Sequence, residues 1–389
     1  MEFNSTSEVE EAVRERYGAA AQAQEAALCC PVDYDTTMLK VIPEEVIERD
    51  YGCGDPSRYV REGDTVLDLG SGGGKICFIA AQIVGEGGRV IGVDTTPDML
   101  DLARRSAPVV AEAIGYDVTA FHRGQIQDLA LDWDKLGAWL SANPITTPDD
   151  LIALEAEKDR LRREEPMIPD NSVDVIVSNC VLNLVADSAK GQLIEEIFRV
   201  LKPGGRIAIS DIVSDEFVPE HLMADPHLWS GCISGSFQER DLMERMERVG
   251  LRGLAIDKWE ETPFAVVEGI EFRSVTITGF KGEEGARVEG NQAVIYRGPF
   301  SEVKDDEGNT LRRGERAAVC TSTFRALSSE TYAGQFVLLS PEGLGEDSEL
   351  PAWDDSRDAV RHPREVKGKR YRNIQMLPGS DCTPGGGCC

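Results

Sequence analysis

Short apolar runs alternate with helix-like stretches over residues 43–281, and this alternation restricts the fold more than any other feature. Five of the runs are rich in Val and Ile and read TVLDLGSGGG, VIGVD, VTAFHRG, VDVIVSN and RIAISDIV. Amphipathic stretches such as SAKGQLIEEIFRVLK separate most of them. Strands joined by helices pair in parallel and carry the helices on both faces. The sequence therefore predicts an α/β fold with a Rossmann-like, doubly wound sheet.

Changes of composition divide the rest of the chain. Residues 1–42 hold an amphipathic helix, predicted at 8–26, and a loop with Cys29-Cys30. Residues 282–353 contain short strands and Gly-rich turns, which predict a small C-terminal β-rich domain of α+β type. Residues 354–389 are expected to form a flexible tail because their end is rich in Gly and Pro and closes with Cys-Cys.

An insertion at about 129–168 separates the third and fourth apolar runs. Thr147 is placed to cap a helix, Pro148 suits its first position, and Asp150 completes a capping box. A charged surface helix is predicted. The sequence leaves open whether the insertion is surface decoration or reshapes access to a site.

Charge and hydropathy exclude several functions for this chain of 389 residues. The net charge of −28 and the pI of about 4.6 disfavour binding to nucleic acid, whose phosphates would be repelled. No run of 18 apolar residues is present, so no membrane span is expected. The N-terminus lacks the layout of a signal peptide. We expect a cytoplasmic monomer.

Cysteine usage is unusual, with ten cysteines in the chain. In a reducing compartment they should be thiols, available as ligands or reactive groups. The sequence has no C-x-x-C or H-E-x-x-H motif, and its four histidines are scattered. No structural metal is therefore predicted.

The segment VLDLGSGGGK carries the first chemical motif. Asp68 ends a predicted strand, and Gly70, Gly72 and Gly74 follow at alternate positions. Glycines there permit a tight turn and a close approach of a ligand to a helix N-terminus. Asp94, about twenty residues on at the end of VIGVD, can accept hydrogen bonds from ribose hydroxyls. The pair predicts a nucleoside cofactor.

The letters DLGSGGGK and VLKPGGRIAISD resemble class I S-adenosylmethionine methyltransferases, which implies that fold and that cofactor. The resemblance departs from the usual pattern at Lys75-Ile76, where Arg-Asp is common, at Gln127, where Glu is common, and at Thr95, where Met is common. It implies the following cofactor-binding residues: Asp68, Gly70, Gly72, Gly74, Asp94, Thr95, Ile126, Gln127 and Asn179.

A narrower resemblance rests on YGCG, SNCVLNL and DPHLWSGCISG, which look like segments of arsenite S-adenosylmethionine methyltransferases. It implies that Cys53, Cys180 and Cys232 bind arsenic(III) as thiolates, and that Cys29 or Cys30 forms a disulfide during turnover. The implied substrates are arsenite and methylarsenite. The implied reductant is an external thiol, thioredoxin or glutathione.

The chemistry of the residues agrees with this resemblance. Cys180 follows the fourth strand, and ligands of doubly wound folds bind outside the carboxyl ends of strands. Arsenic(III) is soft and prefers thiolate sulfur, and three thiolates leave it a lone pair for attack on a methyl group. Alternatives are methylation of another metalloid or of an organic thiol or carbon, or metalloid sequestration. The intact glycine loop and Asp94 disfavour sequestration, and the final methylation state is not determined by the sequence.

Overall fold

The structure is a computed structural model that describes residue 13 and residues 15–20, 34–282, 287–357 and 359–367. It divides into two compact units, Met1–Gly282 and Glu283–Cys389, one residue beyond the boundary expected from the sequence. Cys29, Cys30 and the three C-terminal cysteines lie outside the described residues. No described helix has the length and apolar character needed to cross a membrane.

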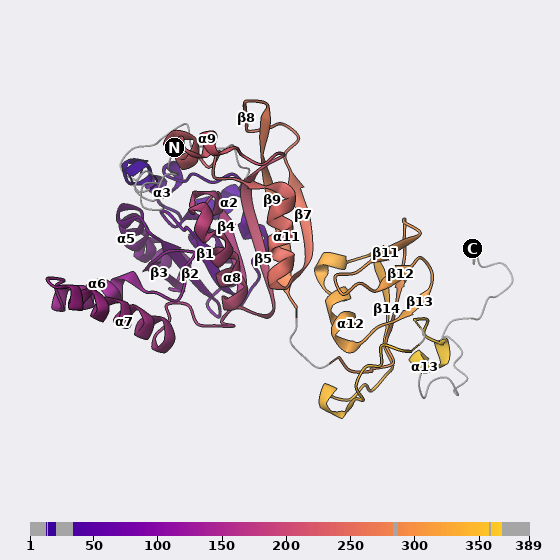
Figure 1. The fold of residues 1–389 in the computed structure, drawn as a ribbon. Coiled ribbons are helices and arrows are strands. Elements are labelled where there is room, and N and C mark those ends of the chain that lie inside the picture. The colour runs from indigo at the N-terminus through magenta and orange to yellow at the C-terminus, as the bar shows by residue number, and fades with distance from the viewer. Residues whose placement is uncertain (1–12, 14, 21–33, 283–286, 358, 368–389) are drawn as a thin grey trace. The chain divides into compact units, whose positions relative to one another are not determined.

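The first unit is built on one mixed sheet (Figure 1) with the strand order β3-β2-β1-β4-β5-β9-β7. Strands β1 to β5 are parallel, and β9 runs antiparallel to β5 and β7. The predicted doubly wound α/β fold is confirmed, and the five predicted runs are the parallel strands β1 to β5. The bounds are β1 Thr65–Leu69, β2 Arg89–Asp94, β3 Thr119–Arg123, β4 Val173–Asn179, β5 Leu201–Ser214, β6 Phe237–Gln238, β7 Leu251–Trp259, β8 Ala265–Val267 and β9 Ile270–Lys281.

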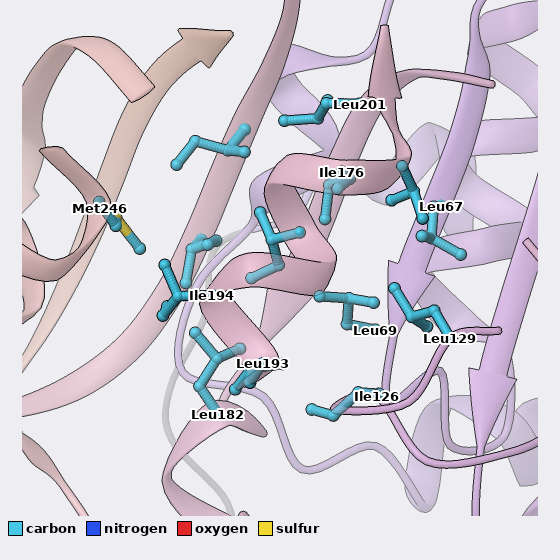
Figure 2. Packing of buried hydrophobic residues seen from close by; sticks show 14 of the residues in the cluster. Leu67, Leu69, Ile126, Leu129, Ile176, Leu182, Leu193, Ile194, Leu201 and Met246 are labelled. Carbon is cyan, nitrogen blue, oxygen red and sulfur yellow. The ribbon is translucent and has the colours of Figure 1, made fainter. Parts of the chain in front are cut away.

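Helices cover both faces of this sheet because alternate strand residues point to opposite sides. On one face, Leu67 and Ile176 pack with residues of α8 and α11, including Leu193 and Met246 (Figure 2). On the other face, Val66 belongs to a cluster with residues of α4. The helix bounds in this unit are α2 Thr36–Leu39, α3 Glu44–Glu48, α4 Lys75–Val84, α5 Pro97–Ile114, α8 Lys190–Val200, α9 Glu220–Met223, α10 Pro226–Ser230 and α11 Glu239–Val249.

The insertion forms two helices, α6 Trp133–Ala142 and α7 Pro148–Glu164, which extend from the β3 side of the sheet (Figure 1). The predicted capping box is present: Asp150 donates its backbone N–H to Thr147 Oγ1 at 3.3 Å, and Asp150 Oδ2 accepts from the Thr147 N–H at 2.7 Å. Most of α7 is exposed, as expected for a charged surface helix.

The second unit is a small α+β domain, as predicted. Its three-stranded antiparallel sheet has the order β13-β10-β14, beside a two-stranded sheet of β11 and β12. Its bounds are β10 Ala293–Tyr296, β11 Glu302–Lys304, β12 Thr310–Arg312, β13 Arg316–Ala318, α12 Thr321–Leu327, β14 Phe336–Leu339 and α13 Pro363–Lys367.

The expectation of a flexible tail from residue 354 is wrong for its described part. Val360 forms a β-bridge with Ala317, and the following Arg361 is fully buried. Its guanidinium donates to Glu289 Oε1 at 2.8 Å and to Glu365 Oε2 at 3.1 Å. A buried guanidinium is tolerated only when it is paired, and this pairing fixes the segment onto the domain.

Candidate active site

The glycine loop forms the floor of a pocket at the carboxyl ends of β1, β2, β3 and β4. Gly70 and Gly72 line it and have positive φ angles of 69° and 50°, and a Cβ on Gly70 would overlap the Val181 side chain. Gly74 is not among the residues that line the pocket, so its role in binding stays a prediction. It caps α4 in the left-handed conformation, with φ 91°, close to Phe78 and Phe121.

Asp94 connects the glycine loop to the second strand. Its Oδ2 accepts from the Gly72 N–H at 2.9 Å, and its Oδ1 accepts from the Thr96 N–H at 2.8 Å. Burial raises the pKa of this carboxyl, and the two backbone donors oppose the rise. A carboxylate oxygen has further acceptor capacity, so Asp94 holds the loop and still offers acceptors to the pocket.

Asp68 lies at the end of β1 and is fully buried beside the pocket. Burial raises its pKa to about 7, and the hydrogen bond from the Cys77 thiol, at 3.2 Å between Sγ and Oδ2, acts in the opposite direction. Cys77 therefore donates a hydrogen bond in addition to packing in the core. Lys75, at one of the positions that depart from the usual motif, forms an ion pair with Asp50.

Asn179 binds the loop that carries Cys53, in addition to lining the pocket. Its Oδ1 accepts from the backbone N–H groups of Cys53, at 2.8 Å, and Gly54, at 3.0 Å. Its Nδ2 donates to the Gly54 carbonyl at 2.8 Å and to the Tyr34 hydroxyl at 3.2 Å. Through these bonds the Asn179 amide holds the cysteine loop against β4. The sequence predicted only a cofactor contact for this residue.

The three predicted arsenic ligands meet in one buried apolar cluster. Cys53 and Cys180 are joined by a disulfide, and the Cys232 thiol donates to the Cys180 carbonyl at 3.2 Å. The expectation that all three are thiols is therefore wrong for the state described, in which Cys53 pairs with Cys180 and not with Cys29 or Cys30. Cys180 and Cys232 both have left-handed φ angles, 58° and 60°, which non-glycine residues rarely adopt.

A buried acid and amide join the two loops that carry these left-handed cysteines. Asp211 accepts from the Leu182 N–H at 2.9 Å and from Asn183 Nδ2 at 2.9 Å, and Asn183 Nδ2 also lies 3.3 Å from the Cys232 carbonyl. A carboxylate oxygen of Asp211 and the sulfurs of Cys53 and Cys180 all lie within 4.8 Å of one another. Burial raises the pKa of Asp211 to about 7.

The described part of the N-terminal helix also reaches the cysteine cluster. The Tyr17 hydroxyl lies 3.8 Å from Cys232 Sγ, and Arg16 donates to the His227 carbonyl at 3.0 Å. Tyr51 donates to the Ala20 carbonyl at 3.0 Å. Burial raises the pKa of Tyr17 well above its ordinary value, so its hydroxyl stays protonated and can donate to sulfur.

The structure brings most of the predicted residues together. One pocket is lined by Asp68, Gly70, Gly72, Asp94, Thr95, Ile126, Gln127, Asn179 and Cys180. The sequence motifs did not predict five further residues at the site: Tyr17, Arg123, Trp133, Asn183 and Asp211. Asp211 had a usable signal, because it is an acid inside the apolar run RIAISDIV. The other four residues had no signal in the sequence except that they lie near recognised motifs.

Known proteins that are similar in sequence show which family this chain belongs to. A methyltransferase domain model matches residues 61–250, and a model of a domain of unknown function matches residues 283–371. The arsenite methyltransferase of Aquipseudomonas alcaligenes is 31% identical over 347 residues, which are 84% of this chain and 89% of the relative. The chain belongs to the arsenite methyltransferase family.

Other members of the arsenite methyltransferase family agree with this assignment. The human enzyme is 29% identical over 90% of this chain and 86% of its own length. The crystal structure of an arsenic(III) S-adenosylmethionine methyltransferase from Chlamydomonas reinhardtii has a TM-score of 0.54 and 26% identity, covering 86% of this chain and 100% of that one. Both the central sheet and the C-terminal domain thus fall within the likeness.

The pocket of this family member has the donors and acceptors that a sulfonium nucleoside needs. Asp68 and Asp94 are acids that can face a positive charge and hydroxyl groups. Ser71 Oγ, in the glycine loop, is buried and has no hydrogen-bond partner among the described residues. A buried hydroxyl without a partner is costly, so this atom favours a ligand with polar groups. The residues present therefore fit S-adenosylmethionine.

Proposed function

We propose that this protein transfers methyl groups from S-adenosylmethionine to trivalent arsenic held by Cys53, Cys180 and Cys232. The observation that carries the proposal is the meeting of these cysteines, from three separate loops, in one buried cluster. Cys180 also lines the pocket formed by the glycine loop and Asp94. The acceptor's ligands and the cofactor pocket are therefore neighbours, as a direct transfer requires.

Substrate binding requires reduction first, because Cys53 and Cys180 form a disulfide in this state. Two equivalents of an external thiol, such as glutathione, or one dithiol such as reduced thioredoxin, convert the disulfide to two thiols and become oxidised themselves. Arsenite then exchanges its three hydroxyl groups for three cysteine sulfurs. Each thiol proton leaves with a hydroxyl as water, so no net charge is created in the cluster.

The protein residues then hold the two partners. When bound, S-adenosylmethionine supplies the methyl group, which the arsenic lone pair takes while the carbon–sulfur electron pair stays on the cofactor's sulfur. Asp94 and Asp68 would hold the cofactor, and Asn179 fixes the Cys53 loop. Ile212, Ile233 and Phe272, in the same cluster as the cysteines, exclude water from the sulfurs.

Arsenic becomes pentavalent when it gains the methyl group, and two electrons return it to the trivalent state. Two of the cysteine sulfurs bonded to the arsenic can supply them: both As–S bonds break, an S–S bond forms, and one electron pair returns to the arsenic, whose freed position takes a water oxygen as its proton leaves to solvent. The Cys53–Cys180 disulfide is the kind of state such a step would leave, and its reduction by the external thiol would restart the cycle. In this proposal Cys29 and Cys30 remain candidate partners for thiol–disulfide exchange with the Cys53–Cys180 disulfide.

The test is incubation of the full chain with arsenite, S-adenosylmethionine and glutathione or thioredoxin, followed by arsenic speciation. We expect methylated arsenic and an equal amount of S-adenosylhomocysteine in each turnover. Arsenite that is bound without formation of S-adenosylhomocysteine would favour sequestration instead. Faster turnover of antimonite than of arsenite would assign the site to another metalloid. Light scattering of the same sample tests the predicted monomer.

A further inference from the structure

The cofactor pocket contains two side chains to which the sequence motifs assigned no role, Arg123 and Trp133. Both line the pocket together with Asp94 and the glycine loop. Arg123 is the last residue of β3, and Trp133 is the first residue of the inserted helix α6. Asp132 fixes that start, because its side chain accepts from the backbone N–H groups of the first turn at 2.9 and 3.0 Å.

The order of the strands gives the pocket a direction. Cys180 follows β4, the glycine loop follows β1, Asp94 ends β2 and Arg123 ends β3, in the spatial order β4-β1-β2-β3. Asp94 and Arg123 are paired across the parallel strands β2 and β3. A nucleoside with its sulfur beside Cys180 and its ribose at Asp94 therefore directs its base towards Arg123.

Arg123 has a donor that no group among the described residues accepts. Its Nε is buried, and no acceptor among the described residues reaches it. The guanidinium carbon lies 5.6 Å from the centroid of the Trp133 ring, which holds the side chain beside the indole. An unpartnered buried N–H is rare in folded proteins, and it is satisfied when a ligand supplies an acceptor.

We propose that Arg123 and Trp133 bind the adenine base of the cofactor. The Trp133 indole packs against the base, and Arg123 Nε–H donates to one of its ring nitrogens. Adenine has both a π-face and ring acceptors, which match this pair of side chains. The insertion then has a binding role, because α6 carries Trp133 into the pocket. This inference depends on the proposed function, which identifies the cofactor as S-adenosylmethionine.

Binding of S-adenosylhomocysteine, measured by calorimetry on the full chain, tests the indole without any turnover. Trp133→Ala should weaken binding by roughly tenfold, the effect of losing a base-stacking partner, and Trp133→Phe by much less. Trp139→Ala is the matched control, because Trp139 lies on the same helix but does not line the pocket. Equal affinities for Trp133→Ala and Trp139→Ala would overturn the assignment.

Fluorescence gives a second readout that a merely structural tryptophan would not change. Stacking on adenine should quench Trp133, so S-adenosylhomocysteine should quench wild type and Trp139→Phe but much less Trp133→Phe. Undiminished quenching in Trp133→Phe would reject stacking. If wild type binds no S-adenosylhomocysteine at all, the proposed function fails as well, whereas normal wild-type binding with unaffected Trp133 variants rejects only this inference.

Deaza analogues of adenosine test Arg123. Replacing a ring nitrogen by C–H removes one acceptor, so the analogue that lacks the nitrogen bound by Arg123 should bind wild type roughly fivefold more weakly than adenosine. Arg123→Met keeps the aliphatic stem but has no donor, and it should bind adenosine and that analogue equally. Wild-type affinities that are the same for adenosine and its 1-, 3- and 7-deaza analogues would show that Arg123 reads no ring nitrogen.

Discussion

The cysteine end of the pocket and its nucleoside end differ in the hydrogen bonds that surrounding protein groups make with some of their key side chains. At the cysteine end, Asn179 and Asp211 each form several hydrogen bonds with surrounding protein groups. At the nucleoside end, Ser71 Oγ and Arg123 Nε are buried without partners among the described residues. Asn183 Oδ1 at the cysteine end also has no partner among the described residues, so the difference concerns particular side chains. Protein groups hold Asn179 and Asp211, whereas Ser71 Oγ and Arg123 Nε are left for a ligand.

This difference agrees with what each end has to do. Arsenic must be held in a fixed direction for attack, which needs ligands whose own positions are fixed by their surroundings. Cys180 and Cys232 have unusual left-handed backbones that the Asp211–Asn183 contacts help to hold. The cofactor enters and leaves in every turnover. We therefore expect changes at the cysteine end to affect chemistry and changes at the nucleoside end to affect affinity.

The largest expected effect is the loss of a cysteine ligand. Cys180→Ser and Cys232→Ser should each abolish arsenite methylation, because two sulfurs hold the arsenic loosely and misdirect its lone pair. Binding of S-adenosylhomocysteine should stay within about twofold of wild type, since neither sulfur completes the nucleoside end. Cys320→Ser, in the second unit, is the control. Near wild-type turnover in either active-site variant would refute three-sulfur binding.

A large effect on stability is expected from Asp68, whose pKa is about 7 in the folded protein because it is buried. The unfolded chain has an ordinary carboxyl, so between pH 4 and 7 only the folded state keeps the proton. The free energy of unfolding should therefore fall as pH rises through that range, by up to about 4 kcal/mol from this group. Asp68→Asn should make this decrease in the free energy of unfolding smaller. Part of the decrease should remain, because the pKa of Asp211 is also raised to about 7.

Denaturant unfolding of the cofactor-free protein at several pH values measures this effect. Asp174→Asn is a control of opposite sign, because the pKa of Asp174, beside Lys202, is lowered in the folded protein. Relative to wild type, Asp174→Asn should lower the free energy of unfolding more at neutral pH than at acidic pH. A wild-type pH profile that Asp68→Asn leaves unchanged would show that Asp68 is ionised in the fold.

An effect on affinity alone is expected from Asp94. Asp94→Ala should weaken cofactor binding by about 1.5–3 kcal/mol, the value of hydrogen bonds to a charged group, and leave arsenite binding almost intact. Part of the loss would come through the glycine loop, since Asp94 accepts from the Gly72 N–H. Calorimetry with S-adenosylhomocysteine and with arsenite separates the two affinities. Unchanged cofactor affinity would remove Asp94 from the site.

The sequence predicted those parts of the molecule that local patterns determine. The five parallel strands and the capping box of α7 were predicted because each is encoded within a few neighbouring residues. Pairings over long sequence distances were not, such as the Cys53–Cys180 disulfide, which spans 127 residues, and the contact of Asn183 with Asp211. The position of Trp133 in the pocket was also unpredictable, because it depends on where an inserted helix begins relative to β3.

The smallest expected effect tests whether the cysteine end extends to the N-terminal helix. Tyr17→Phe removes the hydroxyl that lies 3.8 Å from Cys232 Sγ and keeps the ring that packs on Tyr51. The loss of one hydrogen bond should raise the arsenite concentration for half-maximal rate by roughly 2- to 12-fold, with cofactor affinity unchanged.

Tyr116→Phe is the matched control, because Tyr116 donates to the Ala81 carbonyl at 3.2 Å and does not line the pocket. The same arsenite dependence in both variants would show that Tyr17 only packs. A loss of cofactor affinity in Tyr17→Phe would instead mean that the helix serves both ends of the pocket, and the division between them would have to be redrawn.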